Sequence, residues 1–446
     1  MPKIKNPALD QVSDTPFIQT AGAAVNYRDS WRIFRIMAEL VDGYQLLENL
    51  QREVTIFGSA RLPANSKFFK VAENLGKLLA KASFTVITGG GPGIMEAATK
   101  GAYQAGGETV GINIQLPFEQ RINPYVKKSA AFYYFFTRKV MMTSPANAFV
   151  FFPGGFGTLD EFFEVVDSME LGQMEISPIV LVGKDFWEPL IKFLRHRSSQ
   201  MVHSVSESIV NSWHIVDTAD EAFQFIKDTK DRPNVCEVGS PNLLCQGAND
   251  WRIFRIMAEL VDGFEFLTHL KEDVTVLGTK SIMVGSQYYQ AAYELGKILS
   301  KNGNTTITGG GPGIMEAANK GAFETGGESV GINMRYEKGE RVNNYLTRSI
   351  GFFFPFVRKL IITAPSKAFV FFPGGFGTLH QLFELLTLQE TKKIDPIPTL
   401  LYDQEFWQPL LDYVHILHSD FNTISPLDED YIKVINSPEE VLEYLR

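Results

Sequence analysis

Cysteine is scarce in this sequence of 446 residues, with only Cys236 and Cys245. Two cysteines cannot build the disulfide framework that is typical of small secreted domains. No apolar run reaches the roughly 18 residues that a membrane-spanning helix needs. The N-terminal segment also lacks the apolar core of a signal peptide. We therefore expect a cytoplasmic protein that does not enter a membrane.

An excess of basic residues is also missing, because Lys and Arg number 42 against 51 Asp and Glu, for a net charge of −9. An acidic chain is a poor candidate for nucleic-acid binding. The 45% hydrophobic and 21% charged fractions are typical of a soluble globular protein and exclude disordered and fibrous classes. The length suggests two or three domains.

The chain contains a long internal repeat. Residues 31–43 return unchanged as residues 251–263, and a shift of 220 positions keeps the register without a gap through residue 170. Roughly half of the positions from 31 to 170 are identical after this shift, which indicates duplication of a whole domain. We call residues 31–227 copy A and residues 250–446 copy B. Residues 1–30 are an N-terminal extension, and the Pro- and Gly-containing segment 228–249 reads as a linker.

Within copy A, apolar patterns of strand and helix type alternate. This alternation predicts an α/β fold, with a Rossmann-like, doubly wound parallel sheet in each of the two tandem copies. Ligands of such sheets bind at the carboxyl ends of the strands. The predicted helices cover residues 31–47, 67–81, 94–105 and 136–144, and the predicted strands cover 54–57, 84–88, 109–114, 148–152, 178–182 and 213–216.

Two predicted strand-to-helix turns are rich in glycine, one over residues 89–93 and one over 153–158. Glycine lets the backbone approach a phosphate closely, and the N-terminus of the following helix offers free N–H donors. A tight turn without a ligand is the alternative. Two such turns in one sheet favour a phosphate-bearing ligand.

Two common nucleotide-binding motifs are absent. The sequence has neither the G-x-G-x-x-G fingerprint nor the G-x-x-x-x-G-K-[ST] loop, and no ribose-binding acid follows the strand over 109–114. NAD binding and ATP hydrolysis are therefore disfavoured. A mononucleotide or a sugar phosphate remains.

The strings GGGPGIMEAA over 89–98 and PGGFGTLDE over 153–161 resemble the LOG ("Lonely Guy") family. Members of that family hydrolyse nucleoside 5′-monophosphates to a free base and ribose 5-phosphate, and many carry an older lysine decarboxylase label. The resemblance extends to residues 57–61, 116–120 and 136–139, and the leading WRIFR helix is similar to the longer bacterial subgroup. It implies a hydrolase that needs no metal or organic cofactor.

The resemblance further implies a catalytic pair, Arg138 and Glu161. A carboxylate stabilises the positive charge that develops on the ribose carbon and orients or deprotonates water. Arg138 would hold the phosphate or assist the leaving base, and Glu96 would bind ribose hydroxyls. The other substrate-binding candidates are turn residues and their neighbours: Gly58, Ser59, Gly89, Gly90, Gly91, Gly93, Met95, Lys139, Pro153, Gly154, Gly155, Gly157 and Thr158.

Structural alternatives exist for several of these residues. Thr158 and Glu161 have the spacing of a capping box, and Glu96 could complement the dipole of its helix. Arg138 and Lys139 could lie on a solvated helix face. The aromatic run over 132–136 could stack a base, but core packing is favoured.

Copy B keeps the glycine turns but changes the acid, since Gln381 stands where copy A has Glu161. We expect a second nucleotide site there that binds but hydrolyses poorly. Because LOG proteins assemble as dimers, the chain is expected to form its own pseudo-dimer, in which copy B completes or regulates site A, with further homo-oligomers conceivable. The second-site candidates are Gly310, Gly311, Gly313, Glu316, Arg358, Gly374, Gly375, Gly377 and Thr378.

Two functions follow from these observations. The first is hydrolysis of a nucleoside 5′-monophosphate, of AMP or modified-adenine type, in copy A. The alternative is a nucleotide sensor or carrier without hydrolysis. His415 and His418 have the spacing of a metal pair, but no third ligand is evident, so we expect no metal site.

Overall fold

The computed structural model describes residues 27–48, 50–115, 122–230, 249–270, 272–335 and 342–445. Most of the predicted linker and of the N-terminal extension lies outside these residues. The segment 116–120, quoted above for the family resemblance, also lies outside them. Among the described residues, no helix combines the length and the apolarity that spanning a bilayer requires.

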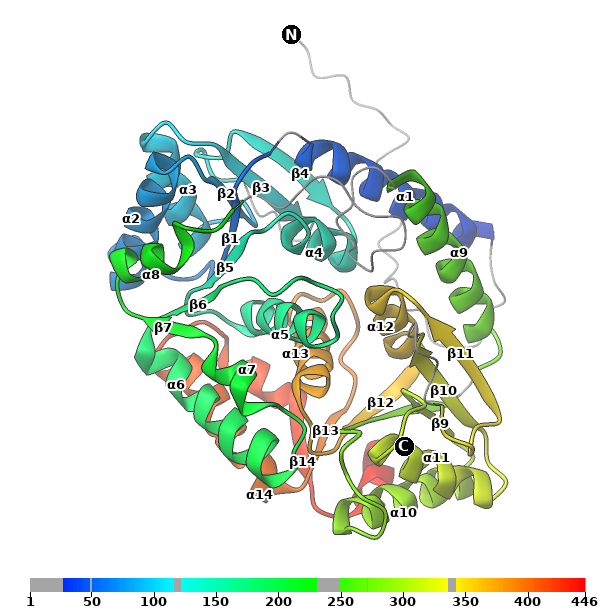
Figure 1. Cartoon of the computed structure of the whole chain (residues 1–446). Coiled ribbons are helices and arrows are strands. Elements are labelled where there is room, and N and C mark those ends of the chain that lie inside the picture. The colour runs from blue at the N-terminus through cyan, green and yellow to red at the C-terminus, as the bar shows by residue number, and fades with distance from the viewer. Residues whose placement is uncertain are drawn as a thin grey trace.

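Copy A forms seven strands and the helices that cover them (Figure 1). The strands are β1 Glu53–Phe57, β2 Thr85–Thr88, β3 Thr109–Ile114, β4 Lys128–Phe132, β5 Ala148–Phe151, β6 Ile179–Val182 and β7 His214–Val216. The helices are α1 Tyr27–Leu47, α2 Lys67–Lys81, α3 Ile94–Gln104, α4 Phe135–Thr143, α5 Phe156–Glu170, α6 Lys184–Phe193, the π-helix η1 Leu194–Met201, α7 Glu207–Asn211 and α8 Ala219–Ile226.

Copy B repeats this order. Its strands are β8 Asp273–Leu277, β9 Thr305–Thr308, β10 Ser329–Met334, β11 Arg348–Phe352, β12 Ser366–Phe371, β13 Thr399–Tyr402 and β14 Ile432–Ile435. Its helices are α9 Asn249–Leu267, α10 Gln287–Lys301, α11 Ile314–Glu324, α12 Pro355–Thr363, α13 Phe376–Glu390, α14 Gln404–Ser419 and the 3₁₀ helices η3 Pro426–Tyr431 and η4 Pro438–Tyr444. Helices α1 and α9 begin slightly before residues 31 and 250, where copies A and B are predicted to begin. The domain boundaries remain predictions.

Each copy builds one parallel sheet, in the order β4-β3-β2-β1-β5-β6-β7 and β11-β10-β9-β8-β12-β13-β14. The central strand β1 is buried along its whole length, because helices cover both faces of the sheet. The predicted Rossmann-like α/β fold is confirmed. Strand order reverses between β1 and β5, and parallel α/β sheets bind their ligands at the carboxyl ends of the strands at such a point.

Strand β4 was not predicted, although it forms an edge of the first sheet. Only Phe132 of its five residues is buried, and lysine begins it. An edge strand with one polar face lacks the apolar run that marks the central strands. The aromatic residues after it confirm the core-packing interpretation, since Tyr134 and Phe136 are buried in the core.

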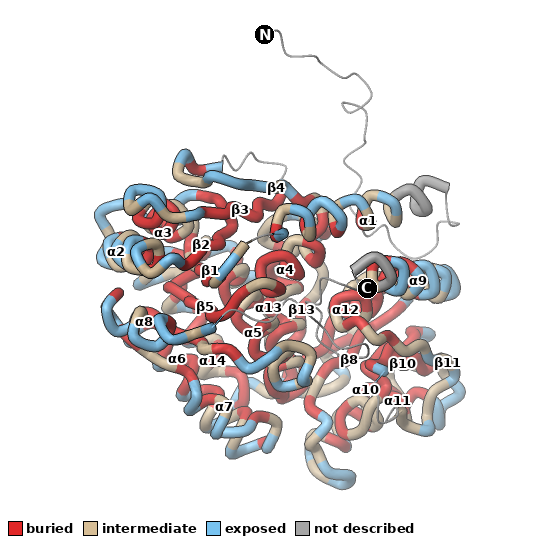
Figure 2. The backbone as a smooth tube through the Cα atoms, turned by 45° about the horizontal axis from the view of Figure 1, so that its top comes forward, coloured by how far each residue is buried: buried red, intermediate tan, exposed pale blue. Residues whose placement is uncertain are grey.

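The two copies pack against each other inside the chain. Helix α5 lies beside α13 at the centre, α1 beside α9, and α6 beside α14 (Figure 1). The rings of Phe163 and Phe383 stack at 5.4 Å between the two central helices, and those of Phe136 and Phe356 stack at 5.7 Å. Figure 2 shows α5 and α13 within the buried interior, so one apolar core runs from copy A into copy B.

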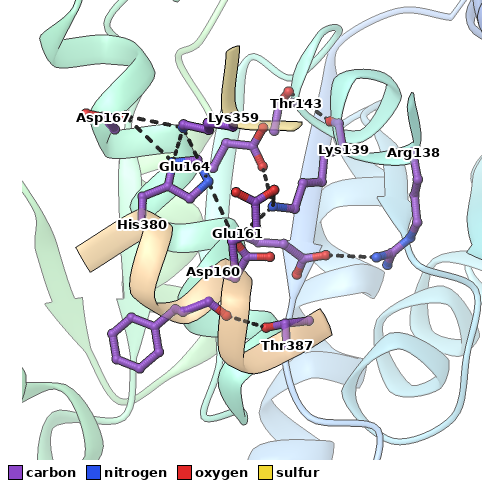
Figure 3. Close-up of polar contacts among 12 residues, drawn as sticks. Arg138, Lys139, Thr143, Asp160, Glu161, Glu164, Asp167, Lys359, His380 and Thr387 are labelled. Atoms are coloured by element: carbon purple, nitrogen blue, oxygen red, sulfur yellow. Dashed lines mark hydrogen bonds and ion pairs between the residues drawn. The ribbon is translucent and has the colours of Figure 1, made fainter. Parts of the chain in front are cut away.

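A buried cluster of charges crosses this interface (Figure 3). The Nζ atom of Lys139 lies 2.8 Å from Asp160 and 3.3 Å from Glu164 in copy A, and 3.6 Å from Glu384 in copy B. The Lys139 side chain is 3% exposed. Burial alone would lower the pKa of Lys139, but the three carboxylates raise it well above its usual value. Lys139 is therefore a permanent cation that joins the copies.

The matching lysine of copy B reaches back into copy A. Lys359 lies 3.4 Å from Asp167 and also hydrogen-bonds with His380. By the shift of 220 residues, His380 corresponds to Asp160, and its Nε2 lies 3.5 Å from the Asp160 carboxylate. Burial and the neighbouring Lys359 lower the pKa of His380. The two halves of the cluster therefore differ in chemistry.

We predict that Lys139→Met destabilises the fold by about 3–5 kcal/mol, because it leaves buried carboxylates without their cation. Urea unfolding measures this change. Lys100→Met is the matched control, since the pair of Lys100 and Glu73 is partly exposed and contributes less than about 1 kcal/mol. Equal losses in the two variants would contradict the role given to Lys139.

Candidate active site

Three turns meet where β1, β2 and β5 end. The backbone N–H of Ser59, after β1, donates to the carbonyl of Pro153, after β5, at 3.0 Å. The N–H of Ile94, after the first glycine turn, donates to the carbonyl of Ser59 at 3.0 Å. The predicted glycine turns 89–93 and 153–158 and the segment 58–59 are thus held together at the carboxyl ends of the strands, as their sequence positions indicated.

Glycine is required at the closest approach of these turns. Gly93 has φ +69, and a Cβ there would lie 2.3 Å from the carbonyl oxygen of Ser59. Asn123, which sequence reasoning missed, donates from Nδ2 to the carbonyls of Gly90 and Gly91, both at 3.0 Å. This side chain therefore fixes the conformation of the turn, in which the N–H of Gly90 donates to the hydroxyl of Thr88 at 3.1 Å.

The capping-box interpretation of Thr158 and Glu161 is wrong. Helix α5 begins at Phe156, its N-cap is Gly155, and no side chain caps it. Glu161 therefore lies in the second turn of the helix, beyond the reach of the N-cap backbone. Its carboxylate instead pairs with Arg138, at 3.2 Å from Nη1 (Figure 3).

Arg138 is fixed from three sides. Its Nε donates to the carbonyl of Ile112 at 3.0 Å, and its Nη1 meets Glu161. A Cβ on Gly89 would lie 2.7 Å from its Nη2, so the absent side chain of Gly89 makes room for the guanidinium. The side chains of Arg138 and Glu161 are only 11% and 12% exposed, which excludes a solvated helix face for Arg138.

The environment of Glu161 adjusts its acidity. Burial raises the pKa of Glu161 to about 7, although the positive charges of Arg138 and Lys139 lower it. A carboxyl group with a pKa near neutrality exchanges protons readily at physiological pH. Glu161 thus has the acidity that a general base requires.

Three other predicted substrate-binding residues of copy A lie in different environments. Met95 reaches back to Gly89, where an added Cβ would lie 2.8 Å from its sulfur. Glu96 lies in the first turn of α3 and is partly exposed, so both its ligand role and its dipole role stay predictions. The ammonium group of Lys139 is held by carboxylates at the interface, away from Arg138 (Figure 3). This placement does not support a substrate contact for Lys139.

Copy B supplies part of the surroundings of this site. Arg61, after β1, lies 2.8 Å from Glu390 of α13. Lys393 donates to the carbonyls of Gln115 and Tyr133 at 2.7 and 3.2 Å. A Cβ on Gly155 would lie 2.7 Å from the carbonyl oxygen of Thr423. No pattern within copy A indicates these neighbours.

In copy B, five of the predicted second-site residues line one cavity: Gly311, Arg358, Gly375, Gly377 and Thr378. Arg358 repeats the anchor of Arg138, with its Nε donating to the carbonyl of Ile332 at 2.8 Å. Glu316 differs from Glu96, because it accepts a hydrogen bond from the hydroxyl of Tyr289 at 3.1 Å. The other candidates, Gly310, Gly313 and Gly374, belong to the same two turns.

The expectation that His415 and His418 have no third neighbour of ligand type is wrong. Glu429 lies 3.5 Å from His415 and 3.6 Å from His418, so three donor atoms converge. The His415 side chain is 63% exposed. The arrangement is that of a surface ion-pair cluster.

A family model described as "Possible lysine decarboxylase" matches residues 95–226 and 315–445, which together exceed half of the chain. The chain belongs to this family. It is the LOG family that the two glycine-rich strings resemble, and the match in both copies confirms the tandem arrangement.

Two relatives in the LOG family share the name cytokinin riboside 5′-monophosphate phosphoribohydrolase. The protein from Rhodococcoides fascians is 26% identical over 148 residues, which are 32% of this chain and 75% of the relative. The protein from Mycobacterium marinum is 28% identical over 167 residues, which are 37% of this chain and 88% of the relative.

Among solved structures, the molybdenum cofactor binding protein from Rippkaea orientalis is 20% identical. The match covers 40% of this chain and 98% of the chain of that protein, with a TM-score of 0.32.

The raised pKa of Glu161 predicts how the stability of the protein changes with pH. Its pKa rises from 4.5 to about 7 on folding, so the folded state holds this proton more tightly. The resulting stabilisation is complete below pH 4.5 and is lost as the pH rises through 7. Between pH 4.5 and 8, the free energy of unfolding of Glu161→Gln should therefore rise by roughly 3 kcal/mol relative to that of wild type. Urea unfolding measures this change.

Glu390 provides a comparison, because burial and the charge of Asp428 raise its pKa to about 7 as well. Glu390→Gln should show a gain of the same sign. A flat difference between Glu161→Gln and wild type across this pH range would contradict the buried, proton-holding state of Glu161.

Proposed function

We propose that copy A hydrolyses the N-glycosidic bond of nucleoside 5′-monophosphates, of AMP or modified-adenine type. The products are a free base and ribose 5-phosphate. The observation that carries this proposal is the buried pair of Glu161 and Arg138 next to two uncapped glycine turns. Membership of the LOG family and the names of the two relatives support the same activity.

The phosphate binds at the turns, because helices α3 and α5 both begin without a side-chain cap. The N–H of Ile94 donates to the carbonyl of Ser59, so the next N–H groups of α3 and those at the start of α5 hydrogen-bond to phosphate oxygens, and both helix dipoles favour the negative charge. Glu96, in the first turn of α3, lies near the same carboxyl ends of the strands and hydrogen-bonds to the ribose hydroxyls. In this proposal the ribose lies between the turns and Glu161.

Glu161 acts on the ribose carbon C1′ and on water. As the bond between C1′ and the base nitrogen breaks, its electron pair leaves with the base and positive charge spreads over C1′ and the ring oxygen. The Glu161 carboxylate stabilises this charge and accepts one proton from the water whose oxygen bonds to C1′. The leaving base takes up the proton that Glu161 received from the water, which restores the carboxylate, and the Arg138 guanidinium balances the charge of the carboxylate and of the phosphate.

The alternative is a sensor or carrier that binds nucleotide without hydrolysis. Such a protein needs the glycine turns but has no need of a carboxylate with a pKa near 7. Copy B has this simpler composition, with the turns and Arg358 present and Gln381 at the acid position. Hydrolysis in copy A is therefore the better account of the difference between the copies.

Glu161→Gln should lower ribose 5-phosphate release from AMP by at least about a hundredfold, because the amide neither accepts the water proton nor carries negative charge. Binding of AMP, measured by calorimetry, should persist. In the wild type, kcat/KM should rise with pH up to about 7 and level off above it, since only the ionised Glu161 is active.

Glu73→Gln is the matched control and should retain both the rate and the pH profile. Unchanged release by Glu161→Gln would show that another group is the base. If the wild type releases no base from any nucleoside 5′-monophosphate, the sensor or carrier alternative holds.

A further inference from the structure

Copy B contains a cavity of about 770 Å³ whose wall is shared by both copies. One side is formed by the two glycine turns of copy B together with Arg358, Lys280 and Gln381. The opposite side comes from copy A, through Asp167, Glu170 and Ser204. Asp167 and Glu170 belong to α5, which packs against α13 of copy B.

The lining of this cavity suits a phosphate-bearing ligand with a polar body. Helices α11 and α13 start at the glycine turns without side-chain caps, and Lys280 and Arg358 add positive charge. The Nε2 atom of Gln381 is buried and has no hydrogen-bond partner among the described residues. A buried amide donor without a partner is costly, and an acceptor oxygen on a ligand in this cavity would satisfy it.

At the position that Glu161 holds in copy A, this lining has an amide in place of a carboxylate. The Gln381 amide accepts no proton from water and has no charge to stabilise a cationic ribose carbon. His380, the neighbouring residue, is fully buried against Lys359 and Asp167 and does not line the cavity. A ligand bound here would stay intact.

We propose that copy B binds a nucleoside 5′-monophosphate without hydrolysing it, and that this binding sets the activity of copy A. The class of ligand rests on the proposed function. The coupling rests on the two central helices, each of which extends from one site to the other.

Helix α5 carries Glu161 into the copy A site and, about two turns later, Asp167 and Glu170 into the wall of the copy B cavity. Helix α13 carries Gln381 into the copy B cavity, and its last residue, Glu390, pairs with Arg61 beside the copy A site. A helix moves as a rigid element. A ligand that shifts α5 or α13 at one site therefore shifts a residue at the other.

The charge cluster strengthens this connection. Lys359, which lines the copy B cavity, lies 3.4 Å from Asp167 on α5. In the opposite direction, Lys139 of copy A lies 3.6 Å from Glu384 on α13. Because these pairs are buried, a change in the position of either lysine is poorly screened by water.

The binding step is tested with the full chain carrying Glu161→Gln, which leaves AMP unhydrolysed. Calorimetric titration with AMP should give two sites per chain. Adding Arg358→Ala, or Lys280→Glu at an exposed position of the cavity wall, should weaken one of the two sites by about tenfold or more. Arg348→Ala is the matched control, because Arg348 pairs with Glu328 away from the cavity, and it should retain both sites.

A single site that neither variant weakens would overturn the proposal. Two sites in a wild-type chain that hydrolyses no nucleotide would leave the binding inference standing while the proposed function fails. Hydrolysis with one site per chain would support the proposed function and overturn the binding inference.

The coupling step is tested by the kinetics of AMP hydrolysis. With Glu161 intact, kcat or kcat/KM of Lys280→Glu should differ from wild type by about fivefold or more, whereas Arg348→Ala should match wild type. Equal kinetic constants in Lys280→Glu and wild type, with the copy B site shown to be weakened, would overturn the regulatory part of the proposal.

Discussion

The packing of α5 against α13 is the contact on which both sites depend. The stacked rings of Phe163 and Phe383 and the carboxylates around Lys139 hold the two helices together. Glu161 lies on α5, and its burial raises its pKa to about 7. The packing of α5 against α13 also brings Glu390 to Arg61 and forms the shared wall of the copy B cavity.

Duplication within one chain lets the two halves of this contact differ. In a dimer of identical subunits, a change at one position appears on both sides of the two-fold axis. Here Asp160 faces His380 across the interface, and Glu161 in copy A has Gln381 as its counterpart. Asp167, likewise, corresponds to Thr387. One copy can thus keep the reactive carboxylate while the other keeps only the binding turns.

Much of the fold and part of the site could be predicted from local pattern. The apolar central strands and the glycine turns stand out in the sequence, whereas Arg138 and Glu161 were indicated by the resemblance to the LOG family. Strand β4 did not, because an edge strand with a single buried residue has no apolar run. The capping box failed because spacing alone does not show where a helix begins, and α5 begins at Phe156.

The sequence by itself determined the repeat, the parallel α/β class and the difference between Glu161 and Gln381, because these depend on residue identity and short-range periodicity. Only the tertiary structure decided that Glu161 pairs with Arg138, that its pKa lies near 7, and that Asp167 and Glu170 belong to the cavity of the other copy. These properties arise from burial and from contacts between residues far apart in the chain. The Arg138–Glu161 pair forms within copy A, whereas the shared cavity depends on how helices of the two copies pack, and no local pattern encodes either.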